Sequence, residues 1–101
     1  MRFDEVMTNS QIAAVFDEIA SMLERKKDNI FKIRAYRKVA RAVGELAEPI
    51  AKLVADDRLH EIPGVGPAIS KKITELVSTG RLEYLERLKK ELAEQSHAVE
   101  S

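Results

Sequence analysis

Apolar residues recur at intervals of three and four along nearly the whole of this 101-residue chain. That spacing places them on one face of an α-helix, and no stretch alternates for long enough to predict a β-strand. The clearest stripe consists of Ile12, Phe16, Ile19 and Leu23. A chain of this length closes one modest hydrophobic core. The sequence therefore predicts an all-α domain, a compact bundle of four to five helices.

Capping residues set the expected ends of the first two helices. Thr8, three residues before Gln11, fits a capping box at the start of the first helix, and the cations Lys26-Lys27 suit its end. Asp28 is expected to cap a second helix that runs to about Leu46. The apolar arc of this second helix is expected to consist of Phe31, Ala35, Val39, Ala42 and Leu46.

Proline and glycine punctuate the second half of the chain. A short third helix is expected to start at Glu48-Pro49, and one helical turn is expected at residues 58–61. The next amphipathic helix, Ile69 to Val77, is expected to end at Gly80, because glycine readily adopts the left-handed conformation of a helix C-cap. The last helix carries Leu82, Leu85, Leu88 and Leu92.

The end of the chain shows no helical period beyond Glu94. Aperiodic polar termini fray when no packing holds them. We therefore expect residues 9–92 to form the domain, and residues 93–101 to be a flexible tail or the start of a linker.

Composition excludes several kinds of protein and site. The absence of cysteine excludes disulfides, thiolate metal sites and cysteine nucleophiles. Met1–Glu5 lacks the pattern of a signal peptide, and no apolar run approaches the roughly 20 residues of a membrane-spanning helix. Asp56-Asp57 are interpreted as caps, and His60 and His97 are too far apart in sequence to predict a metal site. We therefore expect an intracellular monomer, in the cytoplasm, nucleoid or nucleus, that contacts no membrane.

Charge is unevenly distributed, although seventeen Lys and Arg residues balance seventeen Asp and Glu residues. The basic segment from Arg25 to Arg41 contains Asp28 as its sole acid. At 100° per residue, one arc of the second helix is expected to carry Arg34, Arg37, Lys38 and Arg41. Lys32 lies off this basic arc and beside Tyr36, four residues later. The pattern is typical of a solvated helix face, and also of contacts with a polyanion or with an acidic protein partner.

The strongest local signal is the hairpin Ile62-Pro63-Gly64-Val65-Gly66-Pro67, directly before a helical pattern. Two glycines flanked by prolines predict a tight turn that a ligand can approach closely, because no Cβ obstructs it. Pro67 suits the first position of the following helix. The backbone N–H groups of Gly64, Gly66 and Ala68 are then expected to point outward at the positive end of the helix dipole. A phosphate is the expected ligand.

The longer pattern resembles the helix-hairpin-helix motif of DNA repair and replication proteins. It comprises Ile62-Pro63-Gly64-Val65-Gly66, Ile69 and Lys71-Lys72-Ile73. Two further pieces, Phe31 to Lys38 and Ser78 to Leu82, extend the resemblance. Together the stretch from Asn9 to about Glu91 resembles the N-terminal eight-kilodalton domain of family X DNA polymerases, the group that includes polymerase beta. The order and spacing of the three pieces match that family.

This resemblance implies that the domain binds the DNA backbone at the 5′ side of a gap, independently of base sequence. It also implies that the backbone N–H groups of the hairpin donate hydrogen bonds to a phosphate. In the family Val65 packs inward, and Lys32 and Tyr36 match phosphate contacts. DNA binding itself requires no cofactor, but the family implies Na⁺ or K⁺ on the backbone carbonyls of His60, Ile62 and Val65. Polymerase domains are expected to follow in the same protein, because nucleotidyl transfer needs metal-binding aspartates on a separate palm domain.

Lys72 matches the lysine that several family members use as a Schiff-base nucleophile to excise a 5′-deoxyribose phosphate. An amine attacks an aldehyde only when it is unprotonated, and a neighbouring cation such as Lys71 lowers its pKa. Two lysines of the lyase-active pattern are replaced by Ala68 and Tyr84. A histidine is replaced by Phe31, and the acid before the nucleophile by Lys71. We therefore prefer DNA binding over lyase chemistry.

Three functions stay open at the level of the sequence. The preferred one is binding of gapped, nicked or duplex DNA in DNA repair, through the hairpin, the basic arc and Lys32, Tyr36, Val65 and Lys71. The second is a β-elimination lyase that uses Lys72. The third is a helical protein-interaction domain whose basic arc meets an acidic partner.

Overall fold

A computed structural model of the chain describes the backbone of residues 7–100 and the side chains of residues 7–95. In that part of the chain all regular structure is helical, with five α-helices and one turn of 3₁₀ helix. The elements are α1 (Asn9–Arg25), α2 (Ile30–Gly44), α3 (Ile50–Ala55), η2 (Leu59–Glu61), α4 (Pro67–Thr79) and α5 (Glu83–Glu100). The predicted all-α bundle of four to five helices is confirmed.

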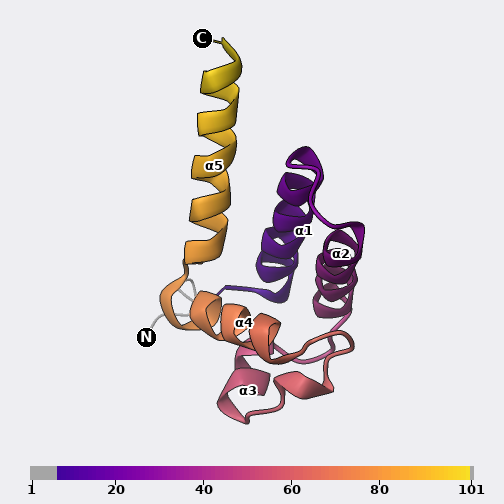
Figure 1. Cartoon of the computed structure of the whole chain (residues 1–101). Helices are drawn as coiled ribbons and strands as arrows, with labels where there is room; N and C mark the ends of the chain where they lie inside the picture. The colour runs from indigo at the N-terminus through magenta and orange to yellow at the C-terminus, as the bar shows by residue number, and fades with distance from the viewer. Residues whose placement is uncertain (1–6, 101) are drawn as a thin grey trace.

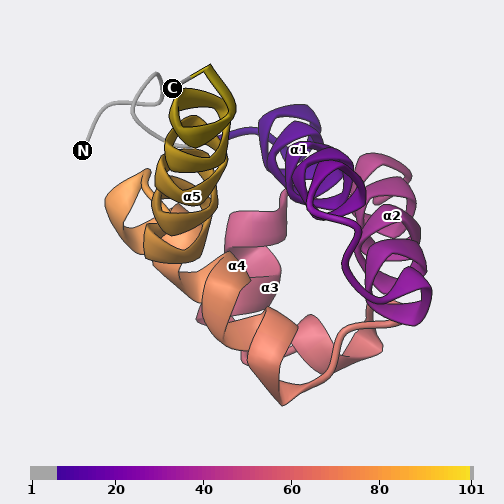
Figure 2. The same ribbon diagram turned by 45° about the horizontal axis from the view of Figure 1, so that its top comes forward.

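The helices form two groups that face each other. α1 and α2 lie side by side and run in opposite directions (Figure 1). α5 packs against α1, and α3 packs against both α4 and η2. In the second view α4 and α5 lie on one side of the molecule, with α1 and α2 on the other (Figure 2). Apolar side chains from both groups fill the space between them.

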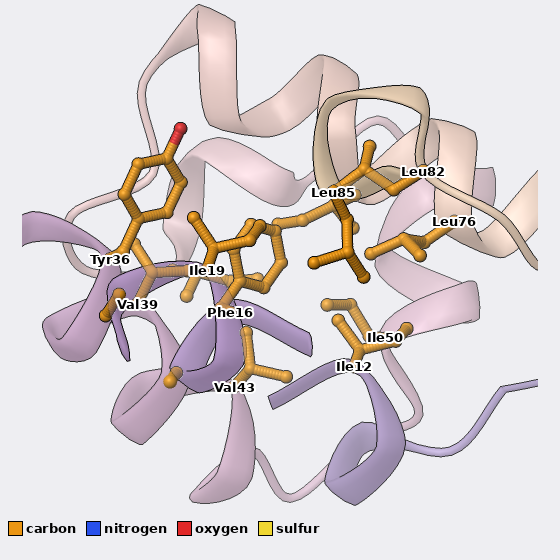
Figure 3. Close-up of a cluster of buried hydrophobic side chains, with 14 of the residues drawn as sticks. Ile12, Phe16, Ile19, Tyr36, Val39, Val43, Ile50, Leu76, Leu82 and Leu85 are labelled. Carbon is orange, nitrogen blue, oxygen red and sulfur yellow. The ribbon is translucent and has the colours of Figure 1, made fainter. Parts of the chain in front are cut away.

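One hydrophobic core joins these helices. The stripe predicted on α1 is fully buried, since Ile12, Phe16, Ile19 and Leu23 are all 0% exposed. The residues that meet this stripe from the other elements include Val39, Val43, Ile50, Leu76, Leu82 and Leu85 (Figure 3). Within the described residues, the core contains no charged side chain. Charged groups that carry function therefore lie outside it.

The first helix starts as its capping residues predict, and the second starts one residue later. The Thr8 hydroxyl accepts a hydrogen bond from the Gln11 N–H at 3.1 Å, and the Gln11 side-chain oxygen accepts one from the Thr8 N–H at 2.8 Å. α2 is capped by Asn29, whose side chain accepts from the Phe31 N–H at 2.7 Å. The predicted cap, Asp28, is wrong because its carboxylate accepts from the adjacent Asn29 N–H at 2.6 Å.

α4 ends as predicted, whereas α5 is longer than predicted. Gly80 has a left-handed φ of 75°, and its N–H donates to the Leu76 carbonyl at 2.8 Å. α5 continues to Glu100, past the expected end near Glu94. Alanine, glutamate and glutamine are strong helix formers and extend a helix without an apolar period. The use of residues 93–101 as a linker stays a prediction.

α2 is rotated relative to the predicted apolar arc. Phe31 is 74% exposed and Ala35 is exposed, whereas Ile33 and Tyr36 are 5% and 6% exposed. The prediction is therefore wrong for Phe31 and Ala35, whereas Val39 is fully buried and Ala42 and Leu46 pack against the core. The physical reason is size. The observed stripe carries larger side chains, and the hydrophobic free energy grows with the apolar area removed from water.

Two exclusions made from the sequence concern membranes and metals. No helix in residues 7–100 is long and apolar enough to cross a membrane. Among the described side chains there is no group of three or more His, Cys, Asp or Glu residues that is suited to a metal ion. The predictions about Met1–Glu5 and about the side chain of His97 lie outside the described residues.

The orientation of α2 predicts different outcomes for two neighbouring truncations. Ile33→Ala should lower the free energy of unfolding by about 2–4 kcal/mol, because it opens a cavity in the core. Phe31→Ala should change it by less than about 0.5 kcal/mol, because the ring is already in water. Urea denaturation followed by circular dichroism measures both. A larger loss for Phe31→Ala than for Ile33→Ala would restore the arc expected from the sequence.

Candidate functional site

The hairpin is a tight turn anchored in the core. The Val65 N–H donates to the Ile62 carbonyl at 3.1 Å and closes a β-turn with Pro63 and Gly64 at its centre. Gly64 has a φ of 87°, the left-handed value that such a turn requires at its third residue. Ile62 is 2% exposed, and Val65 is partly buried against the core. The local sequence thus fixes both the shape and the position of the turn.

Three backbone N–H groups of the hairpin are available to a ligand. Gly66 is the N-cap of α4, Pro67 is the first residue of the helix, and no side chain caps this end. In the part of the chain that the structure describes, the N–H groups of Gly64, Gly66 and Ala68 donate to no protein acceptor. They lie at the positive end of the α4 dipole, which favours an anion. The tight turn and the helix that begins at Pro67 are therefore present as predicted, and phosphate binding there stays a prediction.

The turn lies against α2 at Lys38. A Cβ placed on Gly64 would be 3.6 Å from the Cδ atom of Lys38 and 3.6 Å from the Cγ2 atom of Val39. Because the Lys38 ammonium is two bonds beyond Cδ, it lies within reach of an anion held at the turn. The acid that precedes the hairpin, Glu61, is paired with Arg58 at 3.0 Å, and this hydrogen bond lowers the pKa of the Glu61 carboxyl. Its charge is therefore compensated.

The predicted basic arc forms one exposed face. A shallow groove of about 250 Å³ is lined by Arg34, Arg37, Lys38 and Arg41. Arg37 turns toward α1, where it pairs with Asp17 at 3.6 Å and also with Glu24. Among the described residues, no acid pairs with Arg34, Lys38 or Arg41. Three of the four cations are thus free to meet another molecule, a distinction that spacing on one helix does not reveal.

A second cavity, of about 580 Å³, opens between α4 and α5. Its polar and charged lining comprises Lys71, Lys72, Glu75, Glu83, Tyr84 and Arg87, and Pro67, Ala68 and Leu82 complete it. The Lys72 ammonium lies 4.8 Å from the centroid of the Tyr84 ring, and the Lys32 ammonium lies 5.8 Å from the same centroid. At these distances a cation is attracted to the face of an aromatic ring. Tyr84 therefore brings two sequence-distant lysines together.

The pKa of Lys72 lies below its usual range. The largest cause is partial burial of the amine, and the positive charges of Lys32 and Arg87 add to it. Glu75 acts in the opposite direction. The sequence predicted this direction but assigned it to Lys71, which is not among the causes. The reason is that adjacent residues on a helix do not face each other, so the Lys71 side chain diverges from that of Lys72, whereas Lys32 and Arg87 approach Lys72 from other helices.

Tyr36 is a core residue and not the surface residue expected from its spacing to Lys32. Its ring stacks on Phe16, with 6.0 Å between the ring centroids, and on Tyr84, with 6.2 Å between them. Burial raises the pKa of its hydroxyl, and the neighbouring Tyr84 adds to the effect. The hydroxyl points away from the other labelled core side chains (Figure 3). Lys32 remains exposed, and its ammonium lies 4.0 Å from the Asp28 carboxylate.

Three charged residues of this cavity were not predicted from the sequence: Glu75, Glu83 and Arg87. Arg87 lines the cavity from α5, three residues after Tyr84. Residues three apart on a helix share a face, so the spacing itself was the available signal.

The backbone carbonyls proposed for a monovalent cation belong to η2 and to the turn that follows it. The Ile62 carbonyl accepts the Val65 N–H and keeps one lone pair. In the described part of the chain, the carbonyls of His60 and Val65 accept no backbone hydrogen bond. Uncharged oxygen donors of this kind suit Na⁺ or K⁺. The donor set is therefore compatible with such an ion.

Comparison with known proteins identifies the family. The model of the helix-hairpin-helix domain family matches residues 7–82. The chain therefore belongs to the helix-hairpin-helix domain family. Among its relatives, the DNA polymerase/3′-5′ exonuclease PolX of Bacillus subtilis (strain 168) is 31% identical over 88 residues. These residues make up 87% of this chain and 15% of that protein, so the chain is homologous to a small part of a PolX polymerase.

The two hairpin glycines predict different stabilities when they are substituted. Gly64→Ala should lower the free energy of unfolding by about 1–2 kcal/mol, because it forces a Cβ into the left-handed region. Gly66→Ser should leave it unchanged or slightly raised, because the backbone there is extended, no atom lies within 4 Å of the new Cβ, and serine is a favoured N-cap. Urea denaturation gives both values. Equal losses for the two variants would contradict the left-handed turn.

Proposed function

We propose that this domain binds gapped or nicked DNA at the 5′-phosphate side of the gap, without sequence preference, within a family X DNA polymerase that acts in DNA repair. The observation that carries the proposal is the turn from Gly64 to Ala68, whose N–H groups at Gly64, Gly66 and Ala68 donate to no acceptor among the described residues and whose Gly64 lies against the Lys38 side chain. The relationship to PolX, which is named a DNA polymerase, supports DNA as the partner. Polymerase domains in the same protein are part of the proposal.

The proposed contacts explain why binding is independent of sequence. Backbone N–H groups and lysine ammonium groups bind phosphate oxygens, and such contacts position a protein on DNA without distinguishing its bases. From the hairpin the positive surface continues along α2 through Lys38 to Arg34 and Arg41. A strand whose phosphate lies at the turn therefore meets further cations at its neighbouring phosphates.

The hairpin carbonyls give a role to a monovalent cation. We propose that Na⁺ or K⁺ binds to the carbonyl oxygens of His60, Ile62 and Val65. When bound, the ion adds a positive charge beside the phosphate. The protein supplies the rigid turn that holds the three carbonyls, and DNA contacts through the N–H groups do not require the ion.

Salt titration tests the DNA proposal. The affinity for labelled gapped DNA should fall as the salt concentration rises, with log K declining by about 0.9 per phosphate contacted for each unit of log salt. Lys38→Gln should reduce that slope by about one. Gly66→Ser should weaken binding although the domain stays folded, because the serine hydroxyl then occupies an N–H group of α4. Lys90→Gln on α5, an exposed lysine that lines neither the groove nor the cavity, is the matched control.

The same titration distinguishes the alternatives. Affinity that does not depend on salt would contradict phosphate contacts, and no binding at all would favour the protein-interaction domain. Repeating the titration in tetramethylammonium chloride tests the ion, because this cation is too large for the carbonyl site. Equal affinities in potassium and tetramethylammonium salts would remove the ion from the proposal.

A second function, lyase chemistry at Lys72, is favoured by the lowered pKa of an amine in an open cavity. We propose that Lys72 attacks the C1′ aldehyde of a 5′-deoxyribose phosphate and forms a Schiff base with loss of water. A base then removes a C2′ proton, and the C3′–O bond breaks to release 5′-phosphorylated DNA. Glu75 lines the same cavity and takes the place of the missing acid before Lys72.

Trapping with borohydride tests this chemistry. The wild-type domain should form a covalent adduct with an abasic 5′-phosphate substrate, and Lys72→Ala should lose it, because reduction fixes a Schiff base on that amine. Lys71→Ala is the matched control and should retain the adduct. The trapping rate should rise with pH through the lowered pKa of Lys72, because the free amine is the nucleophile. The absence of a Lys72-dependent adduct would end the lyase proposal and leave DNA binding intact.

A further inference from the structure

We propose that Arg58 is a positioning residue for the DNA-binding hairpin, because it holds the Glu61 carboxylate toward the start of α3 and away from a phosphate at the turn. The inference rests on the proposed function and adds to it a residue outside the hairpin. Arg58 lies in the chain between α3 and η2 and is partly exposed. It lines neither the basic groove of α2 nor the cavity between α4 and α5. Its effect on DNA binding is therefore exerted through other residues.

The Arg58 guanidinium joins two acids that lie on either side of α3 in the sequence. Its Nη2 atom donates to the Glu61 carboxylate at 3.0 Å and to the Glu48 carboxylate at 3.1 Å. Its Nε atom donates a further hydrogen bond to Glu61 at 3.2 Å. A guanidinium presents its donors in a rigid planar fork, so it fixes the direction of the carboxylates that it binds. The Glu61 side chain is therefore directed to Glu48, the second residue before α3.

Glu61 is close enough to the hairpin for its charge to matter there. The Glu61 N–H donates to the Arg58 carbonyl at 3.0 Å within η2. The turn follows at once, closed by the hydrogen bond from the Val65 N–H to the Ile62 carbonyl at 3.1 Å. Consecutive Cα atoms are about 3.8 Å apart, so the Cα atom of Glu61 lies within about 11 Å of that of Gly64. A negative charge at this position opposes the binding of a phosphate at the turn.

Arg58 differs in importance for its two main partners. Hydrogen bonds from Arg58 lower the pKa of the carboxyl groups of Glu48 and Glu61, so both acids stay ionised at neutral pH. Glu48 has a second cation, Lys52, with 3.5 Å between the nitrogen and oxygen atoms. Among the described residues, the ion-pair partner of Glu61 is Arg58. Without the guanidinium, Glu48 stays paired, whereas the Glu61 side chain is free to turn toward the phosphate.

A double-mutant cycle read out by DNA binding tests the inference. Arg58→Gln should weaken the affinity for labelled gapped DNA by about fivefold, the effect of one charge roughly 10 Å from a phosphate near a protein surface. In the Arg58→Gln background, Glu61→Gln should restore most of this loss. Glu61→Gln alone should raise the affinity by less than about twofold, because Arg58 already holds that charge away. Fluorescence anisotropy at constant salt measures all four affinities.

Two matched controls accompany the cycle. Glu48→Gln in the Arg58→Gln background should restore little affinity, because Glu48 lies farther from the hairpin in sequence and keeps Lys52 as its partner. Arg81→Gln breaks a comparable pair, in which Arg81 lies 2.7 Å from Glu86, in the segment between α4 and α5. It should leave the affinity unchanged. A thermal melt by circular dichroism checks that each variant is folded, and Arg58→Lys, which keeps the charge without the planar fork, replaces Arg58→Gln if that variant is unfolded.

The outcomes separate this inference from the proposed function. A loss in Arg58→Gln that persists after Glu61→Gln is added would overturn the inference, because Arg58 would then contact DNA itself or only stabilise the domain. Equal effects of Glu61→Gln in the two backgrounds would overturn it as well, because the charge would then act without being held by Arg58. If Arg58→Gln binds as tightly as the wild type, the inference alone fails. If the wild-type domain binds no gapped DNA, the proposed function itself fails.

Discussion

A column of three aromatic rings connects the core of this domain to its surface. Phe16 of α1 stacks on Tyr36 of α2, and Tyr36 stacks on Tyr84 of α5, with centroid separations of 6.0 and 6.2 Å. Tyr36 is fixed by the tightly packed α1–α2 pair, so Tyr84 rests on a rigid neighbour. The ammonium groups of Lys32 and Lys72 then gather at the Tyr84 ring. Attraction to the ring partly offsets their mutual repulsion, so the ring holds two cations at the cavity that Lys72 and Tyr84 line.

The domain presents two chemically different surfaces to an anion. At the hairpin the donors are backbone N–H groups, which carry no titratable charge and are held by the turn at Gly64. In the cavity the donors are side-chain cations, whose strength depends on burial and on one another. Fixed dipoles favour a defined position for the ligand, whereas clustered charges favour the ligand of highest charge. The fold places both on α4, one at its start and one along its side.

Local chemistry was predictable from the sequence, and contacts between helices were not. A few neighbouring residues determine the left-handed conformations of Gly64 and Gly80 and the start of α4 after the hairpin. These features could therefore be predicted from the sequence. The burial of Tyr36 depends on the rotation of α2 against α1, and the apolar arc predicted for this helix did not include Tyr36. The pairing of Arg37 with acids on α1, and the approach of Arg87 to Lys72, join segments that are distant in sequence. The spacing of residues along one helix does not predict such contacts between helices.

The chain carries no net formal charge, but the cations on the exposed face of α2 lie apart from most of its acids. Arg34, Lys38 and Arg41 form a face that, among the described residues, has no acidic partners, while the acids lie mainly on other helices. Equal and opposite charges held apart make an electric dipole. In the field of a polyanion a dipole experiences mainly a torque and only a weak net pull. In the proposed function this dipole turns the domain to the correct orientation as it approaches DNA, and capture then depends on the short-range fit of the hairpin.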